Sequence, residues 1–404
     1  MPTLRIAIPA MDELDYLPAT LDALSMQNTK LPFEVYVCVN QPDNFWNIPE
    51  KKHICENNQK LLDYLHHYKA LSLHVLDFAS PGCGWIGKKN GVGFARKVLF
   101  ERILSKCDPK DIVISLDADT LVRPHYLQSV ANQFERNPDL NAIAVPYYHP
   151  LNGNDENRDK ALLRYEIYMR NYAVNLLRIH SPYGFTALGS AIAMRADALK
   201  KIGNITPLQS GEDFYLVQKF CKMGGLSLFN TECVYPAGRY SDRVPFGTGP
   251  AMQTGANGIW DSYPIYHHSF FSSIREAYGK MKELYENHLP IMDNDFLRFL
   301  QKDSDKPDIW QEIRHNVSDF PHFVKAFHQK ADGLRILQYV RSKHRLLPDI
   351  ETTALYDNLH LWMPEKCPTW LTPTLSWHQY SLDQLNTIRE LLFHDETQLR
   401  HDYG

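Results

Sequence analysis

Apolar residues in the first part of the chain follow two alternating patterns. Short runs rich in Val, Ile and Leu, at residues 4–8, 33–39 and 112–116, predict buried strands. Longer stretches between them, such as residues 13–27 and 90–104, carry apolar residues at three- and four-residue spacing, which predicts amphipathic helices. Strands that alternate with helices over short connections predict βαβ units and a parallel sheet with helices on both faces.

The same patterns continue to about residue 225. Pro9 is expected to end the first strand, because proline cannot continue a central ladder. Tyr165, Tyr168 and Tyr172 form an aromatic stripe at helical spacing, which is typical of a core face, with the lining of an acceptor site as the alternative. We expect the remaining strands at residues 71–78, 142–146 and 191–194, and further helices near residues 58–65 and 214–222.

The pattern changes after about residue 267. Helical segments rich in His, Lys, Glu and aromatic residues follow, and no strand alternation of similar strength recurs. We therefore expect an α/β fold with a mostly parallel, Rossmann-like sheet flanked by helices, followed by a mainly α-helical extension.

Composition narrows the class of protein. The 404 residues are 44% hydrophobic and 22% charged, as in ordinary globular proteins, and the net charge of -4 gives no reason to expect nucleic-acid binding. No apolar run reaches the length of about 18 residues that a membrane span needs. Seven scattered Cys without a CxxC pair, and no signal-peptide pattern after Met1, favour a cytoplasmic location.

The strand at residues 112–116 runs directly into Asp117-Ala118-Asp119. Acids at the carboxyl end of a parallel strand lie where open α/β sheets bind ligands. If a turn begins at Ala118, the two carboxylates can converge on a hard cation such as Mg²⁺ or Mn²⁺, shared with substrate phosphates. The alternative is a simple strand-end turn in which one Asp caps the next helix.

Two later segments also carry candidate chemistry. Glu212 and Asp213 open a predicted helix, where acids complement the helix dipole even without a further role. Residues 236–264 contain five Gly and four Pro, together with Arg239 and Arg243. Long irregular segments in compact domains are often functional, and arginines beside such turns suit diphosphate recognition, so we expect this segment to form part of a site.

These motifs together resemble family 2 glycosyltransferases with the GT-A fold. Five segments carry the resemblance in the right order, and each is weak alone: Ile8-Pro9-Ala10-Met11-Asp12-Glu13, Gly87-Lys88-Lys89-Asn90-Gly91-Val92-Gly93-Phe94-Ala95-Arg96, Asp117-Ala118-Asp119, Gly189-Ser190-Ala191-Ile192-Ala193-Met194-Arg195 and Gly211-Glu212-Asp213. The sequence departs from the family pattern in its helical C-terminal region, which has no counterpart in the minimal pattern, and at two motif positions. Met11-Asp12 replaces the common Tyr-Asn, and Asn40-Gln41 replaces the usual acidic pair after the second strand.

The resemblance implies a division of the chain and a set of roles. Residues 1–265 would form the transferase domain, with a nucleotide-binding half at 1–120 and an acceptor half at 121–265, and residues 266–404 the helical extension. Asp213 would be the catalytic base, with Glu212 beside it, and Asp117 and Asp119 would hold the metal. The nucleotide-sugar would be contacted by Pro9, Ala10, Glu13, Asn40, Lys88, Gly91, Arg96, Asp117, Ala118 and Arg243.

The expected activity is metal-dependent transfer of a sugar from a nucleotide-sugar, UDP-linked by preference, to a hydroxyl of a carbohydrate or glycan-precursor acceptor. One base opposite the leaving group implies inversion of configuration. The alternatives are a retaining GT-A transferase, a sugar nucleotidyltransferase and a non-catalytic nucleotide-sugar-binding module. The helical extension is a candidate surface for homo-oligomer formation.

Overall fold

The computed structural model describes residues 1–87, 90–209, 211–229, 231–241, 247–286, 293–302, 308–373 and 377–403. The chain forms two compact units. Unit 1 consists of Met1–Leu162, Thr186–Ala256 and Arg400–Gly404, and unit 2 of Leu163–Phe185 and Asn257–Leu399. The expected domain boundary at residue 265 stays a prediction.

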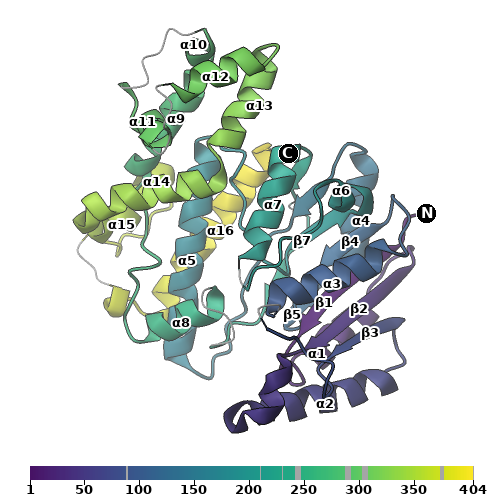
Figure 1. Ribbon diagram of the computed structural model, residues 1–404. Coiled ribbons are helices and arrows are strands. Elements are labelled where there is room, and N and C mark those ends of the chain that lie inside the picture. Colours follow the sequence, from purple (N-terminus) through teal and green to yellow (C-terminus); the bar gives the residue numbers. More distant parts are fainter. Residues whose placement is uncertain are drawn as a thin grey trace. The chain divides into compact units, whose positions relative to one another are not determined.

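Unit 1 is built on a seven-stranded sheet of order β3-β2-β1-β4-β7-β6-β8. Figure 1 shows β1, β2 and β3 side by side in it. All pairs are parallel except those of β7, which runs antiparallel to both β4 and β6. A separate two-stranded sheet joins β5 to β9. The strands are β1 Leu4–Ala10, β2 Phe33–Asn40, β3 Leu73–Phe78, β4 Ile112–Ser115, β5 Thr120–Val122, β6 Ala142–Ala144, β7 Ile192–Arg195, β8 Leu226–Leu228 and β9 Val234–Pro236.

The helices of unit 1 include those predicted near residues 13–27, 58–65, 90–104 and 214–222, and α3 lies across β1 and β2 (Figure 1). They are α1 Leu17–Ser25, α2 Lys52–His67, α3 Val92–Leu104, α4 Tyr126–Arg136, α6 Ala196–Lys201, α7 Glu212–Met223 and α8 Thr248–Ala256, with short 3₁₀ helices η1 Asp43–Asn47 and η2 Pro49–Lys51. The mostly parallel sheet flanked by helices that the GT-A resemblance implies is confirmed. Helix α8 was not expected within residues 236–264.

One prediction about the first strand was wrong. Pro9 does not end β1, which continues to Ala10 with Pro9 opposite Cys38 of β2. On its other side β1 pairs with β4 only as far as Ala7. Pro9 therefore lies where β1 has one neighbour rather than two, and the missing N–H of proline is tolerated at such an edge.

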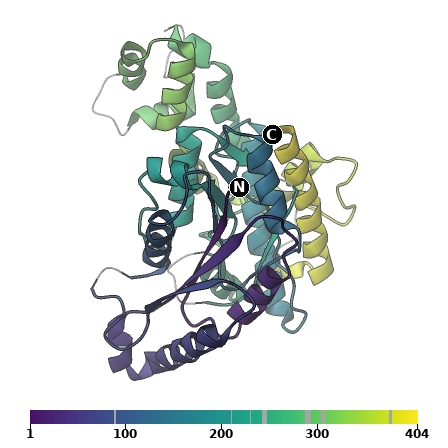
Figure 2. The same ribbon diagram turned by 90° about the vertical axis from the view of Figure 1, so that its right-hand side faces the viewer.

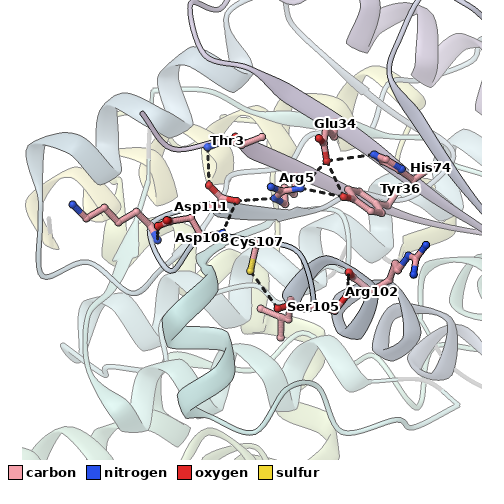
Figure 3. A network of polar contacts seen from close by, with 12 residues as sticks. Thr3, Arg5, Glu34, Tyr36, His74, Arg102, Ser105, Cys107, Asp108 and Asp111 are labelled. Carbon is pink, nitrogen blue, oxygen red and sulfur yellow. Dashed lines mark hydrogen bonds and ion pairs between the residues drawn. The ribbon is translucent and has the colours of Figure 1, made fainter.

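A polar network ties together the amino-terminal parts of the parallel strands (Figure 3). The Arg5 guanidinium donates to Asp111 Oδ2 over 2.7 Å and to Glu34 Oε2 over 2.6 Å, and Tyr36 Oη donates to the same Glu34 oxygen over 2.8 Å. The His74 ring stacks on Tyr36 with centroids 4.4 Å apart. Because these groups lie at the ends of the strands opposite to Asp117, we assign them a structural role in strand alignment.

Unit 2 contains helices and no strand among its described residues, which confirms the helical C-terminal region. Figures 1 and 2 both show α9 to α13 gathered into one cluster. The helices are α5 Glu156–Arg178, which begins in unit 1, α9 Ser272–Gly279, α10 Met281–Tyr285, α11 Asp295–Lys302, α12 Ile309–Asn316, α13 Phe320–Lys330, α14 Gly333–Leu346, α15 Glu351–Trp362 and α16 Leu382–Tyr403, whose last residues belong to unit 1, with 3₁₀ helices η3 His268–Phe271, η5 Pro348–Ile350 and η6 Trp377–Gln379.

The aromatic stripe of α5 packs inside unit 2. The Tyr165 and Tyr168 rings meet the Tyr263 ring at centroid distances of 5.1 and 5.5 Å, and Tyr172 packs against Tyr266. These contacts favour the core interpretation of the stripe over an acceptor site. No helix among the described residues is long and apolar enough to cross a membrane.

Candidate functional site

The Asp-x-Asp motif forms a turn between two strands. Strand β4 ends at Ser115, and Thr120 N donates to Asp117 O over 3.2 Å before β5 begins. Ala118 is buried in this turn, and its carbonyl accepts from Thr20 Oγ1 over 2.8 Å. The backbone of the motif is therefore fixed, and both carboxylates come from a turn rather than from a continuing strand.

Arg96 brings this motif together with the Glu-Asp motif. Its guanidinium, on helix α3, bonds to Asp117 Oδ1, to Glu212 Oε1 and to Ser115 Oγ, the last over 3.2 Å. Arg96 is 3% exposed and Glu212 is 2% exposed. Burial alone would lower the pKa of Arg96, but the charges of Asp117 and Glu212 raise it above its ordinary value, so the guanidinium stays charged.

A glycine makes room for this buried arginine. Any Cβ built at Gly189 would overlap the Arg96 guanidinium. Gly189 stands at the start of the segment that the family resemblance assigned to the acceptor side, three residues before β7 begins at Ile192. The requirement for glycine here is therefore one of space, because the arginine occupies the volume that a side chain would need.

Asp213 lies in the first turn of α7, next to Glu212. Gly211 precedes the helix with a φ of 75°, a left-handed conformation that glycine adopts without strain. Asp213 Oδ1 accepts from Phe214 N over 2.7 Å. Although the residue keeps some exposed surface, desolvation and then the negative charge of Glu212 raise the pKa of Asp213 to about 7. A carboxyl that titrates near neutral pH is suited to proton transfer.

Asp119, the second aspartate of the motif, forms an ion pair with Arg239. Arg239 Nε donates to Asp119 Oδ2 over 2.9 Å, and Arg239 Nη2 donates to Glu13 Oε1 over 2.5 Å. The guanidinium carbon lies 4.2 Å from the Tyr16 ring centroid. Sequence reasoning placed Arg239 in a site-forming segment but did not connect it to Asp119. The pairing of β5 with β9, which a three-residue strand barely signals, is what brings the two together.

Asn40, which was predicted to contact the nucleotide-sugar, forms hydrogen bonds within the protein. Asn40 is 4% exposed, donates to Ala10 O and Cys38 O, and accepts from Trp85 Nε1 over 3.1 Å. Its amide therefore holds neighbouring backbone and the Trp85 ring. Asn40 as a nucleoside contact stays a prediction, and so do the buried Pro9 and Ala10 at the end of β1.

The structure describes Gly87 and residues 90–93 of the glycine-rich segment at the start of α3. Gly91 caps α3 with a φ of 90° and packs against Gln209, while a Cβ at Gly93 would overlap the Leu208 backbone. Both glycines therefore permit a close approach of α3 to the residues before α7. Lys88 and Arg243 lie outside the described residues, so their predicted nucleotide contacts stay predictions.

The two acids of the Asp-x-Asp turn have the chemistry of ligands for a divalent cation. Asp117 and Asp119 supply carboxylate oxygens, which suit Mg²⁺ or Mn²⁺, and such ions take further ligands from water and substrate phosphates. Among the described residues no group of three His, Cys, Asp or Glu could hold a metal alone. The donor set therefore fits a cation shared with a diphosphate, and Arg239 is bonded to one of the two carboxylate oxygens of Asp119, Oδ2.

The comparisons with known proteins agree with the motifs. Residues 87–203 match the family model described as glycosyl transferase family 2, a range that includes Arg96, Asp117 and Asp119. The match covers less than half of the chain, and it includes three of the five segments that carry the predicted resemblance to this family. No curated protein shows a significant sequence match to the chain.

Solved structures of TarS from S. aureus are similar to this chain at low identity. TarS 1–349 in complex with UDP-GlcNAc is 16% identical with a TM-score of 0.43, and the match covers 89% of each chain. TarS 1–349 in complex with UDP is 14% identical with a TM-score of 0.39, covering 100% of this chain and 91% of that chain.

Proposed function

We propose that this chain is a family 2 glycosyltransferase, which moves a sugar from a nucleoside-diphosphate sugar to an acceptor hydroxyl with inversion and with the help of a divalent cation. The observation that carries the proposal is the bridge made by Arg96, which joins Asp117 of the Asp-x-Asp turn to Glu212 of the Glu-Asp motif. The two motifs are 95 residues apart in sequence, and a single buried guanidinium holds both.

Asp213 is the proposed base. Its carboxylate accepts the proton of the acceptor hydroxyl as the oxygen attacks the anomeric carbon, while the bond from that carbon to the diphosphate breaks and the diphosphate leaves with the electron pair. The raised pKa of Asp213 makes it a stronger base than an ordinary aspartate. Because the base acts on one face and the diphosphate leaves from the other, the configuration inverts.

Glu212 and Arg96 act through position and charge. The negative charge of Glu212 contributes to the raised pKa of Asp213, and Arg96 opposes this effect. Since Arg96 also holds Asp117, the turn with the acids and the start of α7 keep a fixed relation. Arg96 is thus proposed as a positioning residue, in place of the direct nucleotide contact expected from the sequence.

Asp119, with Asp117, would hold the cation, which would neutralise the charge that grows on the leaving diphosphate. The donor is proposed to be a UDP-sugar and the acceptor a carbohydrate or glycan precursor, as the family resemblance implies.

A thermal-shift panel of nucleoside-diphosphate sugars, measured with Mn²⁺ and with EDTA, tests this proposal. We expect one UDP-sugar to raise the unfolding temperature in Mn²⁺ and to have little effect in EDTA. At a hundredfold excess over Kd the stabilisation amounts to about 2.7 kcal/mol. Sugar 1-phosphates, which lack the nucleotide, serve as the control. Stabilisation of equal size in both buffers would contradict the metal-dependent donor site, and no response to any nucleotide-sugar would contradict the function.

A further inference from the structure

The two aspartates of the Asp-x-Asp turn are both paired with arginines, but the two arginines differ in how firmly they are held. The Arg96 side chain is 4% exposed and lies between two carboxylates, Ser115 and Gly189. The Arg239 side chain is 17% exposed and belongs to the irregular segment that follows β9. Arg239 is therefore the guanidinium that can leave its aspartate at the smaller cost.

Arg239 also has a second anchor that does not depend on Asp119. Its Nη2 donates to Glu13 over 2.5 Å, and its guanidinium plane lies over the Tyr16 ring. The Glu13 side chain is 7% exposed, so this pairing is shielded from solvent. If the bond to Asp119 breaks, the arginine can stay beside the turn through Glu13 and Tyr16.

The position of Arg239 conflicts with a cation on Asp119. Arg239 Nε and Nη2 lie 2.9 and 2.8 Å from the same oxygen, Asp119 Oδ2. A cation bound to that oxygen would place two positive charges within a few ångströms of each other, which is strongly unfavourable in a partly buried site. A cation and the arginine therefore cannot share Asp119 Oδ2 in the observed arrangement.

We propose that Arg239 is a built-in counter-cation that competes with the divalent metal for Asp119 and, when displaced, donates its freed N–H groups to the diphosphate. This inference rests on the proposed function and assigns a role to a residue outside the recognised motifs. The diphosphate brings negative charge that both the cation and the displaced guanidinium can share. Metal alone should consequently bind weakly, and metal and nucleoside diphosphate should strengthen each other's binding.

The test is the affinity for Mn²⁺ alone, measured by the electron paramagnetic resonance signal of free Mn²⁺ in wild type and in Arg239→Ala. Removing the competitor should tighten Mn²⁺ binding at least about tenfold, because the cation no longer has to displace a charged hydrogen-bond donor from Asp119. The same variant should bind UDP more weakly than wild type when Mn²⁺ is saturating. A merely structural role of Arg239 would weaken both ligands, so the opposite signs are diagnostic.

Two further variants control the experiment. Arg123→Ala removes a positive charge from an arginine of the same unit that also stacks on a tyrosine, with its guanidinium carbon 5.2 Å from the Tyr235 ring centroid. It should leave Mn²⁺ affinity unchanged. Arg239→Gln keeps the hydrogen-bonding ability and most of the volume without the charge, and it should tighten Mn²⁺ binding as Arg239→Ala does even if the alanine variant folds poorly.

The outcomes separate this inference from the proposed function. If wild type needs Mn²⁺ to bind UDP but Arg239→Ala and Arg239→Gln bind Mn²⁺ no more tightly than wild type, the competition is refuted and the proposed function stands. If none of the proteins binds Mn²⁺, with or without UDP, both the competition and the metal-dependent function are refuted.

Discussion

Replacing Asp213 by asparagine is expected to lower turnover by about 10²–10⁴-fold, the usual contribution of a general base. Donor binding should persist, because Asp213 is not among the residues proposed to hold the cation or the diphosphate. Asparagine is nearly isosteric, and it is as good as aspartate near a helix start, so the first turn of α7 should remain folded. Turnover with the acceptor and calorimetric affinity for the donor, measured on the same preparation, separate the two effects.

The dependence of wild-type kcat/KM on pH provides a second test of Asp213 as the general base. With the pKa of its carboxyl raised to about 7, kcat/KM should rise as pH increases through 7 and level off above it, because only the ionised form accepts a proton. Near-wild-type turnover in Asp213→Asn would assign Asp213 to helix capping and direct attention to Glu212.

The free energy of unfolding should fall as the pH rises toward 7, whereas kcat/KM rises over the same range. The folded chain keeps the Asp213 proton up to about pH 7, whereas an unfolded chain loses it near 3.8, the ordinary pKa of an aspartate. The contribution of this group to stability is therefore fully present below pH 4 and is lost as the pH rises toward 7. An asparagine at this position cannot ionise, so Asp213→Asn should gain stability relative to wild type between pH 4 and pH 7 in urea unfolding.

Replacing Arg96 by methionine is expected to lower the free energy of unfolding by about 3–5 kcal/mol, the cost of leaving a buried charge without its partner. The loss arises because Glu212 would stay buried beside Asp213 with no guanidinium between them and Asp117. Arg102→Met, on the exposed face of the same helix, is the matched control and should change stability by less than about 0.5 kcal/mol.

A double variant distinguishes charge from packing. Combining Arg96→Met with Glu212→Gln removes both charges of the pair, so it should recover much of the loss measured by urea unfolding. The contrary outcome is that the double variant loses as much free energy of unfolding as Arg96→Met and Glu212→Gln lose when their separate losses are added. That result would show that Arg96 stabilises the site by packing and not by its charge.

Much of the sheet could be predicted from the sequence, because buried parallel strands consist of short runs of apolar residues. The strands that begin at Leu4, Phe33 and Ile112 carry such runs, and all three lie side by side in the sheet. The antiparallel direction of β7 could not be predicted. Its apolar run, Ile192–Arg195, fits a parallel or an antiparallel strand equally well.

The sequence indicates the acids of the candidate site and draws attention to its arginines, but it does not show which acids the arginines pair with. Asp117, Asp119 and Glu212 stand out because acids follow an apolar strand or open a helix. Arg96 was predicted to contact the nucleotide-sugar, and a single sequence does not show that Gly189 leaves room for its guanidinium to be buried between Asp117 and Glu212. Arg239 meets Asp119 only because two three-residue strands pair, and such short strands carry almost no periodic signal.

The central claim is that Asp119 holds a divalent cation that carries the diphosphate of the donor. Calorimetric titration of UDP into wild type, Asp119→Asn and Asp139→Asn, each in Mn²⁺ and in EDTA, tests it most directly. Asp139 is an exposed acid of the same unit and serves as the control for lost charge. We predict that Mn²⁺ tightens UDP binding at least about tenfold, or 1.4 kcal/mol, in wild type and Asp139→Asn and has no effect in Asp119→Asn. Equal UDP affinity in Mn²⁺ and EDTA for the wild-type protein would contradict the claim.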